Sequence, residues 1–139
     1  MRIELRKQII LHEGLELKPY ADLGGKITIG VGRNLTDNGI SAEESNILLD
    51  NDIDRSISEL NLNFSWFCGL DDIRQRVLID MCFNLGITKL KKFVLMLAAI
   101  EAKNYDLAAS YMMQSIWAEQ VGIRAIRLSK MMRTGKDYE

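Results

Sequence analysis

The chain has 139 residues, of which 47% are hydrophobic and 27% are charged, with a single proline. A chain of this length can bury a core without disulfides or metals, and the composition excludes a disordered or fibrous protein. The formal net charge is −1 and the sequence pI is about 5.9, so the whole molecule has no electrostatic bias toward nucleic acid or other polyanions.

The N-terminal segment is predicted to form a short helix over residues 2–12. Charged positions alternate with isoleucines that can supply one buried face, and Gly14 can end the helix. The first seven residues are too charged for the apolar core of a secretory signal, and no run reaches the length of a membrane span. We therefore expect synthesis in the cytoplasm without a signal peptide, and no insertion into a membrane.

Residues 17–35 show the alternation of a small hairpin or meander. Apolar residues alternate there with small or polar ones, and Gly24-Gly25 marks a tight turn. Thr28 lies on one of the predicted strands, and residues 37–39 read as a loop.

The remainder of the chain is predicted to be helical. Ser41 with Glu44 forms a capping-box pattern, which starts a helix over 41–60. A connection over 61–69 leads to an apolar helix over 70–85, with Gly86 as its stop. Shorter helices are expected at 91–102, 104–113 and 122–133. The fold class is α+β and mainly helical, with a small β-containing N-terminal lobe joined by a long helix to a helical C-terminal lobe.

Two further features have alternative interpretations. The segment 120–139 carries five basic and two acidic residues, so it either presents a basic face to an anionic polymer or is a solvated helix face favoured by the helix dipole. Cys68 and Cys82 match no metal-binding spacing, and we expect two buried thiols and no metal site.

Three side chains around the hairpin suggest acid–base chemistry. Taken singly, Glu13 is a surface residue at a helix end, Asp22 is a turn residue and Thr28 is a strand residue. The helix dipole disfavours a charged carboxylate at the position of Glu13. Together they match glycoside hydrolysis, which needs an acid for the leaving oxygen and a second carboxylate as nucleophile or as the base that activates water.

The same run resembles a known catalytic signature. Glu13-Gly14, followed by Tyr20-Ala21-Asp22 and Thr28-Ile29-Gly30-Val31-Gly32, is similar to that of the bacteriophage lysozymes of the T-even type, small endolysins that cleave peptidoglycan. The resemblance extends over nearly the whole chain. Further matching segments are 41–54, 70–74, 83–86, Phe93, 115–117, 124–127 and 133–135.

The resemblance implies one lysozyme-like domain over 1–139. Its β-containing lobe would span about 13–40, its connecting helix 41–60, and its helical lobe 61–139 together with 1–12. The implied activity is that of a muramidase (EC 3.2.1.17), which hydrolyses the β-1,4 bond between N-acetylmuramic acid and N-acetylglucosamine. Family members invert the anomeric centre, which needs carboxyl groups roughly 6.5–9.5 Å apart.

The resemblance also implies roles for individual residues. Glu13 would be the general acid, Asp22 the carboxylate that activates water, and Thr28 a group that holds this water. Arg124 would pair with the catalytic glutamate, and Asn84 would line the substrate cleft.

Further supporting positions follow from the same matches. Trp117 and Gln120 would lie behind the acid, although core packing is the simpler role for Trp117. Phe93 and Asn34 would support the substrate site.

The chain departs from the family pattern in a few places. Arg33 stands where the best-known member has a histidine, so Arg33 with Asp52 is expected to form an ion pair that does not respond to pH. Asn34 replaces a leucine and Gly24 a glutamate, so this part of the wall should contact glycan differently. The single histidine, His12, is interpreted as a helix-end cation rather than a catalytic group.

The implied partner is bacterial peptidoglycan, with no cofactor. The protein would be a monomer that acts on the wall, in the periplasm, after release for host cell lysis, with a holin providing access. Two rival interpretations are an inert lysozyme-like binding module and a helical nucleic-acid-binding domain. Both catalytic carboxylates are present, and no nucleic-acid motif accompanies the arginines.

Overall fold

The computed structural model describes residues 1–138 and divides into two compact units, Met1–Leu48 and Leu49–Glu139. Helix α3, spanning Ala42–Asn63, contains the boundary between them. The units are described separately. The predicted grouping of residues 1–12 with the helical lobe therefore stays a prediction. No helix within residues 1–138 combines the length and apolarity needed to cross a bilayer.

The first unit begins with helix α1, Arg2–Glu13, in agreement with the predicted helix. Gly14 ends it with a positive φ of 75°, and its N–H donates to the carbonyl of Ile10 at 2.8 Å. No residue of α1 is buried. Glu13 is therefore the last helical residue, and its side chain projects at the point where the chain turns toward the sheet.

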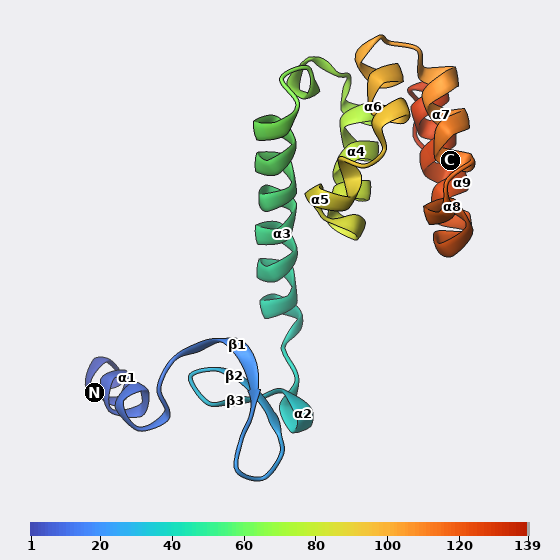
Figure 1. Ribbon diagram of the computed structural model, residues 1–139. Helices are drawn as coiled ribbons and strands as arrows, with labels where there is room; N and C mark the ends of the chain where they lie inside the picture. Colours follow the sequence, from blue (N-terminus) through green and yellow to red (C-terminus); the bar gives the residue numbers. More distant parts are fainter. Residues whose placement is uncertain (139) are drawn as a thin grey trace. The chain divides into compact units, whose positions relative to one another are not determined.

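The predicted hairpin is confirmed as a three-stranded antiparallel sheet. The strands are β1 (Glu16–Ala21), β2 (Ile27–Gly30) and β3 (Arg33–Asn34), in the order β1-β2-β3. In Figure 1 they form the small blue sheet that follows α1. Thr28 is on the central strand, where it pairs with Tyr20 on one side and with Asn34 on the other.

A four-residue helix, α2 (Leu35–Asn38), occupies the segment where a loop was predicted at 37–39. Its N-cap is Asn34, whose Oδ1 accepts from the backbone N–H of Asp37 at 3.0 Å. Thr36 Oγ1 accepts from the N–H of Ile27 at 2.8 Å and ties the segment to the sheet. So short a helix has no apolar period in the sequence, which explains why it was missed.

The capping box at the start of α3 is confirmed. Glu44 N–H donates to Ser41 Oγ at 3.0 Å, and Ser41 N–H donates to Glu44 Oε1 at 2.9 Å. The helix runs three residues past its predicted end at residue 60.

The second unit is a helical bundle. Helices α4, α7 and α9 agree with the predictions, whereas α5 and α8 were not predicted because four and six residues are too few for a clear period. Its elements after α3 are η1 (Phe67–Gly69), α4 (Asp72–Leu85), α5 (Ile87–Leu90), α6 (Val94–Glu101), α7 (Tyr105–Met113), α8 (Ile116–Val121) and α9 (Ile123–Thr134).

The hydrophobic core of the described residues lies within this second unit. Figure 1 shows α7 and α9 side by side, and α4 also packs on α9. The largest fully buried side chains are Leu60, Phe67, Val77, Leu78, Met81, Leu90, Met96, Ile100, Met112 and Met132.

The two cysteines differ in exposure. The prediction of two buried thiols is correct for Cys82, whose burial raises its pKa, and wrong for Cys68, which is exposed in the short helix η1.

Candidate active site

The carboxylate of Glu13 lies against the Gly-x-Gly end of the hairpin. A Cβ built on Gly32 would lie 2.8 Å from Glu13 Oε2 and 3.0 Å from Cδ, closer than van der Waals contact allows. Gly32 also has a φ of +67°, a conformation that other residues adopt only with strain. The backbone therefore favours glycine there, and a larger residue would displace the Glu13 carboxylate from its position.

Asp22 organises the turn between β1 and β2 through one of its two carboxylate oxygens. Oδ1 accepts from the N–H groups of Gly24 and Lys26, each at 2.8 Å. The backbone closes the same turn, because Gly25 N–H donates to the Asp22 carbonyl at 2.9 Å. The side chain is exposed, so the second oxygen, Oδ2, is left to act on a ligand or water.

Thr28 is the only buried residue in the segment 1–48, with 4% of its surface exposed. Its hydroxyl donates to the carbonyl of Lys26 at 3.0 Å. This bond commits the hydroxyl proton and leaves the oxygen lone pairs as acceptors. The neighbouring Lys26 Nζ forms an ion pair with Asp37 at 3.2 Å, which closes the turn from the side of α2.

The three residues predicted to be catalytic therefore belong to one small unit. It holds two exposed carboxylates, Glu13 and Asp22, which are groups able to donate or accept a proton, and the fixed hydroxyl of Thr28, which can accept a hydrogen bond. Within residues 1–138 no group of three or more histidine, cysteine or acidic side chains is placed to hold a metal ion.

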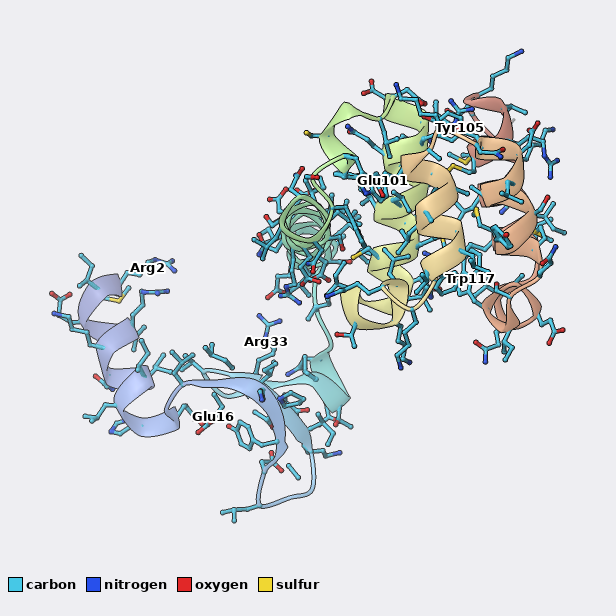
Figure 2. All side chains as sticks on the ribbon, turned by 45° about the horizontal axis from the view of Figure 1, so that its top comes forward. Arg2, Glu16, Arg33, Glu101, Tyr105 and Trp117 are labelled. Atoms are coloured by element: carbon cyan, nitrogen blue, oxygen red, sulfur yellow. The ribbon has the colours of Figure 1, made fainter. Side chains whose placement is uncertain are left out.

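Arg33, one of the positions at which the chain departs from the family pattern, bonds to its neighbours within the first unit. Arg33 Nη1 donates to Glu44 Oε1 at 2.9 Å and to the Gly39 carbonyl at 3.3 Å, next to the start of α3 (Figure 2). The hydrogen bond from Arg33, together with those from Ser41, lowers the pKa of Glu44 to about 2. Asp52 lies 3.9 Å from Arg55 within the other unit, so its predicted pair with Arg33 stays a prediction.

In the second unit, Asn84 is joined to Trp117. Trp117 Nε1 donates to Asn84 Oδ1 at 2.8 Å, and the indole packs edge-on against Phe93 with ring centroids 6.2 Å apart. Trp117 is buried and Asn84 is exposed (Figure 2 labels Trp117). The core residue thus orients the polar one. Gln120 is also exposed, on the same helix α8 as Trp117.

Arg124 has a partner that the sequence interpretation missed. Its Nε and Nη2 both lie 2.7 Å from Asp80 Oδ1, and both residues are half-buried on the facing helices α9 and α4. Asp80 comes four residues before Asn84 and therefore lies on the same side of α4. The four-residue spacing from Asn84 is the sequence signal that could have identified Asp80.

The comparison with known proteins decides the family. The family model described as phage lysozyme matches residues 11–133. The chain belongs to the phage lysozyme family. Its fold is accordingly lysozyme-like, mainly helical with a small three-stranded sheet. Membership of this family implies glycoside hydrolase activity.

Individual relatives align over most of the chain. Two from Dictyostelium discoideum are named probable T4-type lysozyme 1 and 2. Each is 26% identical, over 88% and 97% of this chain and 89% and 98% of their own lengths. A third, the pre-baseplate central spike protein Gp5 of Enterobacteria phage T4, is 29% identical over 88% of this chain but over 26% of its own length. The lysozyme match thus corresponds to one part of that larger protein.

Proposed function

We propose that this protein is a peptidoglycan-degrading lysozyme, an N-acetylmuramidase of class EC 3.2.1.17. It hydrolyses the β-1,4 bond between N-acetylmuramic acid and N-acetylglucosamine. The observation that carries this proposal is the placement of Glu13, Asp22 and Thr28 around one turn-and-sheet unit, with Glu13 against Gly32. The names of the two Dictyostelium relatives support the same activity.

The reaction requires two proton transfers. Glu13, in its acid form, donates its proton to the glycosidic oxygen as the bond from that oxygen to the anomeric carbon breaks. Asp22 accepts a proton from a water molecule whose oxygen bonds to the same carbon. Thr28 accepts a hydrogen bond from this water, because its own proton is committed to the Lys26 carbonyl. A proton from Asp22 returns to solvent and Glu13 is reprotonated, which completes the cycle.

We propose that the reaction proceeds with inversion, because Asp22 then acts on water rather than on the sugar. Proton NMR of the first-formed reducing sugar distinguishes the outcomes. Inversion of the β-linked substrate gives the α anomer first, whereas initial accumulation of the β anomer rejects this part of the proposal.

Loss of turbidity in outer-membrane-stripped bacteria tests the activity. Glu13→Gln and Asp22→Asn should each abolish clearing. Both substitutions keep the shape of the side chain, and asparagine retains the Oδ1 acceptor for the N–H groups of Gly24 and Lys26. Glu16→Gln is the matched control, since it neutralises an exposed carboxylate at the start of β1, labelled in Figure 2. Clearing at the wild-type rate by both active-site variants would make the assignment wrong.

The remaining site residues are proposed in supporting roles. Arg124 pairs with the catalytic acid, Asn84 and Asn34 hydrogen-bond the glycan, and Phe93 and Gln120 shape the surrounding wall.

The biological setting is proposed from the same assignment. The protein is made in the host cytoplasm as a monomer and acts on the cell wall, in the periplasm, during host lysis. A holin opens the route to the wall. Neither a nucleic acid nor a membrane is a partner. Lysis that proceeds on schedule in a phage without a holin would contradict this setting while leaving the enzymatic proposal intact.

A further inference from the structure

The end of α5 and the turn that follows it carry three exposed lysines, Lys89, Lys91 and Lys92, which we call the lysine turn. The sequence has no acidic residue between Asp80 and Glu101, so no carboxylate close along the chain offsets this charge. Within residues 1–138 none of the three ammonium groups forms an ion pair. In a chain whose formal net charge is −1, the lysine turn is therefore a local concentration of uncompensated positive charge.

The backbone of the lysine turn is held by hydrogen bonds. The N–H of Lys92 donates to the carbonyl of Lys89 at 3.1 Å. The N–H of Phe93 donates to the carbonyl of Leu90 at 3.0 Å, and the side chain of Leu90 is fully buried in the core. The points from which the three lysine side chains project are therefore fixed by the fold of the second unit.

The lysine turn is joined to Asn84 by contacts that lie wholly within the second unit. Phe93 follows Lys92 directly, and its ring packs edge-on against Trp117 with centroids 6.2 Å apart. Trp117, labelled in Figure 2, donates from Nε1 to Asn84 Oδ1 at 2.8 Å. Lys89 comes five residues after Asn84, so the Cα atoms of these two residues are at most about 18 Å apart.

The proposed substrate carries negative charge within that distance of its sugars. The N-acetylmuramic acid residues of peptidoglycan bear short stem peptides with free carboxylates, and a stem of roughly four residues spans up to about 14 Å when extended. A glycan strand hydrogen-bonded to Asn84 therefore brings stem carboxylates within reach of the lysine side chains. A lysine ammonium is a compact charge on a flexible stem, so it can follow a mobile carboxylate without one fixed geometry.

We propose that the lysine turn is a specificity determinant, which favours peptidoglycan whose stem peptides keep free carboxylates over peptidoglycan in which they are amidated. This inference rests on the proposed function, in which Asn84 hydrogen-bonds the glycan. The lysines contribute to binding of the polymer and take no part in a chemical step.

The test is a pelleting assay with purified sacculi that are free of teichoic acid, so that phosphate groups do not contribute. The full-length Glu13→Gln variant is used, since it should bind the sacculi without degrading them. Changing all three residues of the lysine turn to glutamine should raise Kd about tenfold at low salt, because each exposed charge pair contributes a part of this factor. The difference should shrink as the salt concentration rises.

Chemical amidation of the sacculi tests the carboxylates directly. When carbodiimide and ammonia have converted the stem carboxyls to amides, the protein with its native lysines should bind no tighter than the triple glutamine variant. A triple arginine variant of the lysine turn keeps the charge and should bind untreated sacculi as the native lysines do.

Lys103, Lys130 and Lys136 supply the matched control. They are exposed, and they form no ion pair with any residue that the structure describes. Changing all three to glutamine removes the same total charge, and Kd should stay within about twofold of its value before the change. An equal rise in Kd for both triple variants would mean that only net charge matters, which overturns the inference. Circular dichroism melting checks that each variant is folded.

The same substitutions in the chain with Glu13 intact give a kinetic readout. The triple glutamine variant of the lysine turn should raise KM on untreated sacculi and leave kcat within about twofold of the wild-type value. An unmoved Kd, or a rise in Kd that persists on amidated sacculi, overturns this inference alone. A wild type that leaves sacculi undegraded overturns the proposed function, and the pelleting assay then still decides whether the lysine turn binds stem carboxylates.

Discussion

The carboxylate of Glu13 occupies the space beside Gly32, where a Cβ on that residue would lie only 2.8 Å from Glu13 Oε2. This approach brings the end of α1 next to the segment between β2 and β3, across the part of the chain that forms β1 and β2. Because Gly32 has no side chain, the Glu13 carboxylate has room to lie beside it. A change at Gly32 should affect catalysis without touching a catalytic residue.

Gly32→Ala tests this contact, with Gly30→Ala as its control. Both glycines have a φ of +67°, so each alanine should cost about 1–2 kcal/mol of stability. Only at Gly32 does the new methyl displace Glu13, because nothing lies within 4 Å of a Cβ at Gly30. We expect Gly32→Ala to lower kcat by about tenfold or more beyond the loss in Gly30→Ala, measured on folded protein. Equal losses would show that the contact is not functional.

Acidification should weaken the Arg33–Glu44 pair. The pKa of Glu44 falls from 4.5 to about 2 in the folded protein. A lowered folded-state pKa gives stability above the unfolded value, and this stability is lost as the pH falls between those two values. The difference in thermal midpoint between the wild type and Glu44→Gln should therefore shrink across that window.

Glu43→Gln is the control for that titration, because it removes the neighbouring carboxylate, which makes no ion pair within residues 1–138. The difference in thermal midpoint between Glu43→Gln and the wild type should not shrink across the same pH window. If the difference in thermal midpoint between Glu44→Gln and the wild type stays constant down to a pH of about 2, the Arg33–Glu44 pair is contradicted.

Trp117→Phe should uncouple Asn84 from the core. The substitution removes the indole N–H that Asn84 Oδ1 accepts at 2.8 Å and keeps an aromatic ring against Phe93. We expect a loss of at least about 1 kcal/mol in urea unfolding and a rise in KM, since the free amide then samples several rotamers. Asn84→Ala should raise KM with a smaller stability loss, because Asn84 is exposed. An unchanged KM in both variants would remove Asn84 from the site.

Arg74, a largely buried charge of the helical unit, should contribute more to stability than the exposed Arg76. It donates to the carbonyls of Met132 at 2.7 Å and Arg133 at 3.1 Å, at the end of α9, and stacks 3.6 Å over the ring of Tyr105 (labelled in Figure 2). Arg74→Lys cannot reproduce this planar arrangement and should cost about 2 kcal/mol in denaturant unfolding.

Arg76→Lys provides the comparison, two residues further along α4. The Arg76–Asp137 pair is about half exposed on both sides, and such surface pairs contribute little. The free energy of unfolding of Arg76→Lys should stay within about 0.5 kcal/mol of the wild-type value. Similar losses at both positions would mean that the carbonyl contacts of Arg74 carry no special weight.

Local patterns in the sequence predicted much of this fold. The Ser41–Glu44 capping box, Gly14 as the end of α1 and the hairpin around Gly24-Gly25 are all present, because each depends on neighbouring residues alone. The short helices α5 and α8 were not predicted. They follow α4 and α7 with almost no spacer, and their positions are determined by packing rather than by a period.

The sequence named candidate site residues, and their identity as a catalytic set stays a prediction, but it did not predict their contacts. Glu13, Asp22 and Thr28 could be chosen from the motif, whereas the approach of Gly32 to Glu13 joins two elements that no local rule connects. Arg33 shows the same limit. The resemblance named Asp52 as its partner, which stays a prediction, whereas the structure pairs Arg33 with Glu44, which the capping box already holds in place.

The Arg33–Glu44 pair also determines how informative a pH–rate curve will be. A guanidinium whose pKa is raised further by its partner, and a carboxylate with a pKa of about 2, keep their charges at every pH at which an enzyme is normally assayed. The small lobe therefore has no titrating ion pair next to the start of α3. A pH-dependent loss of activity above about pH 5 would therefore not report on this ion pair.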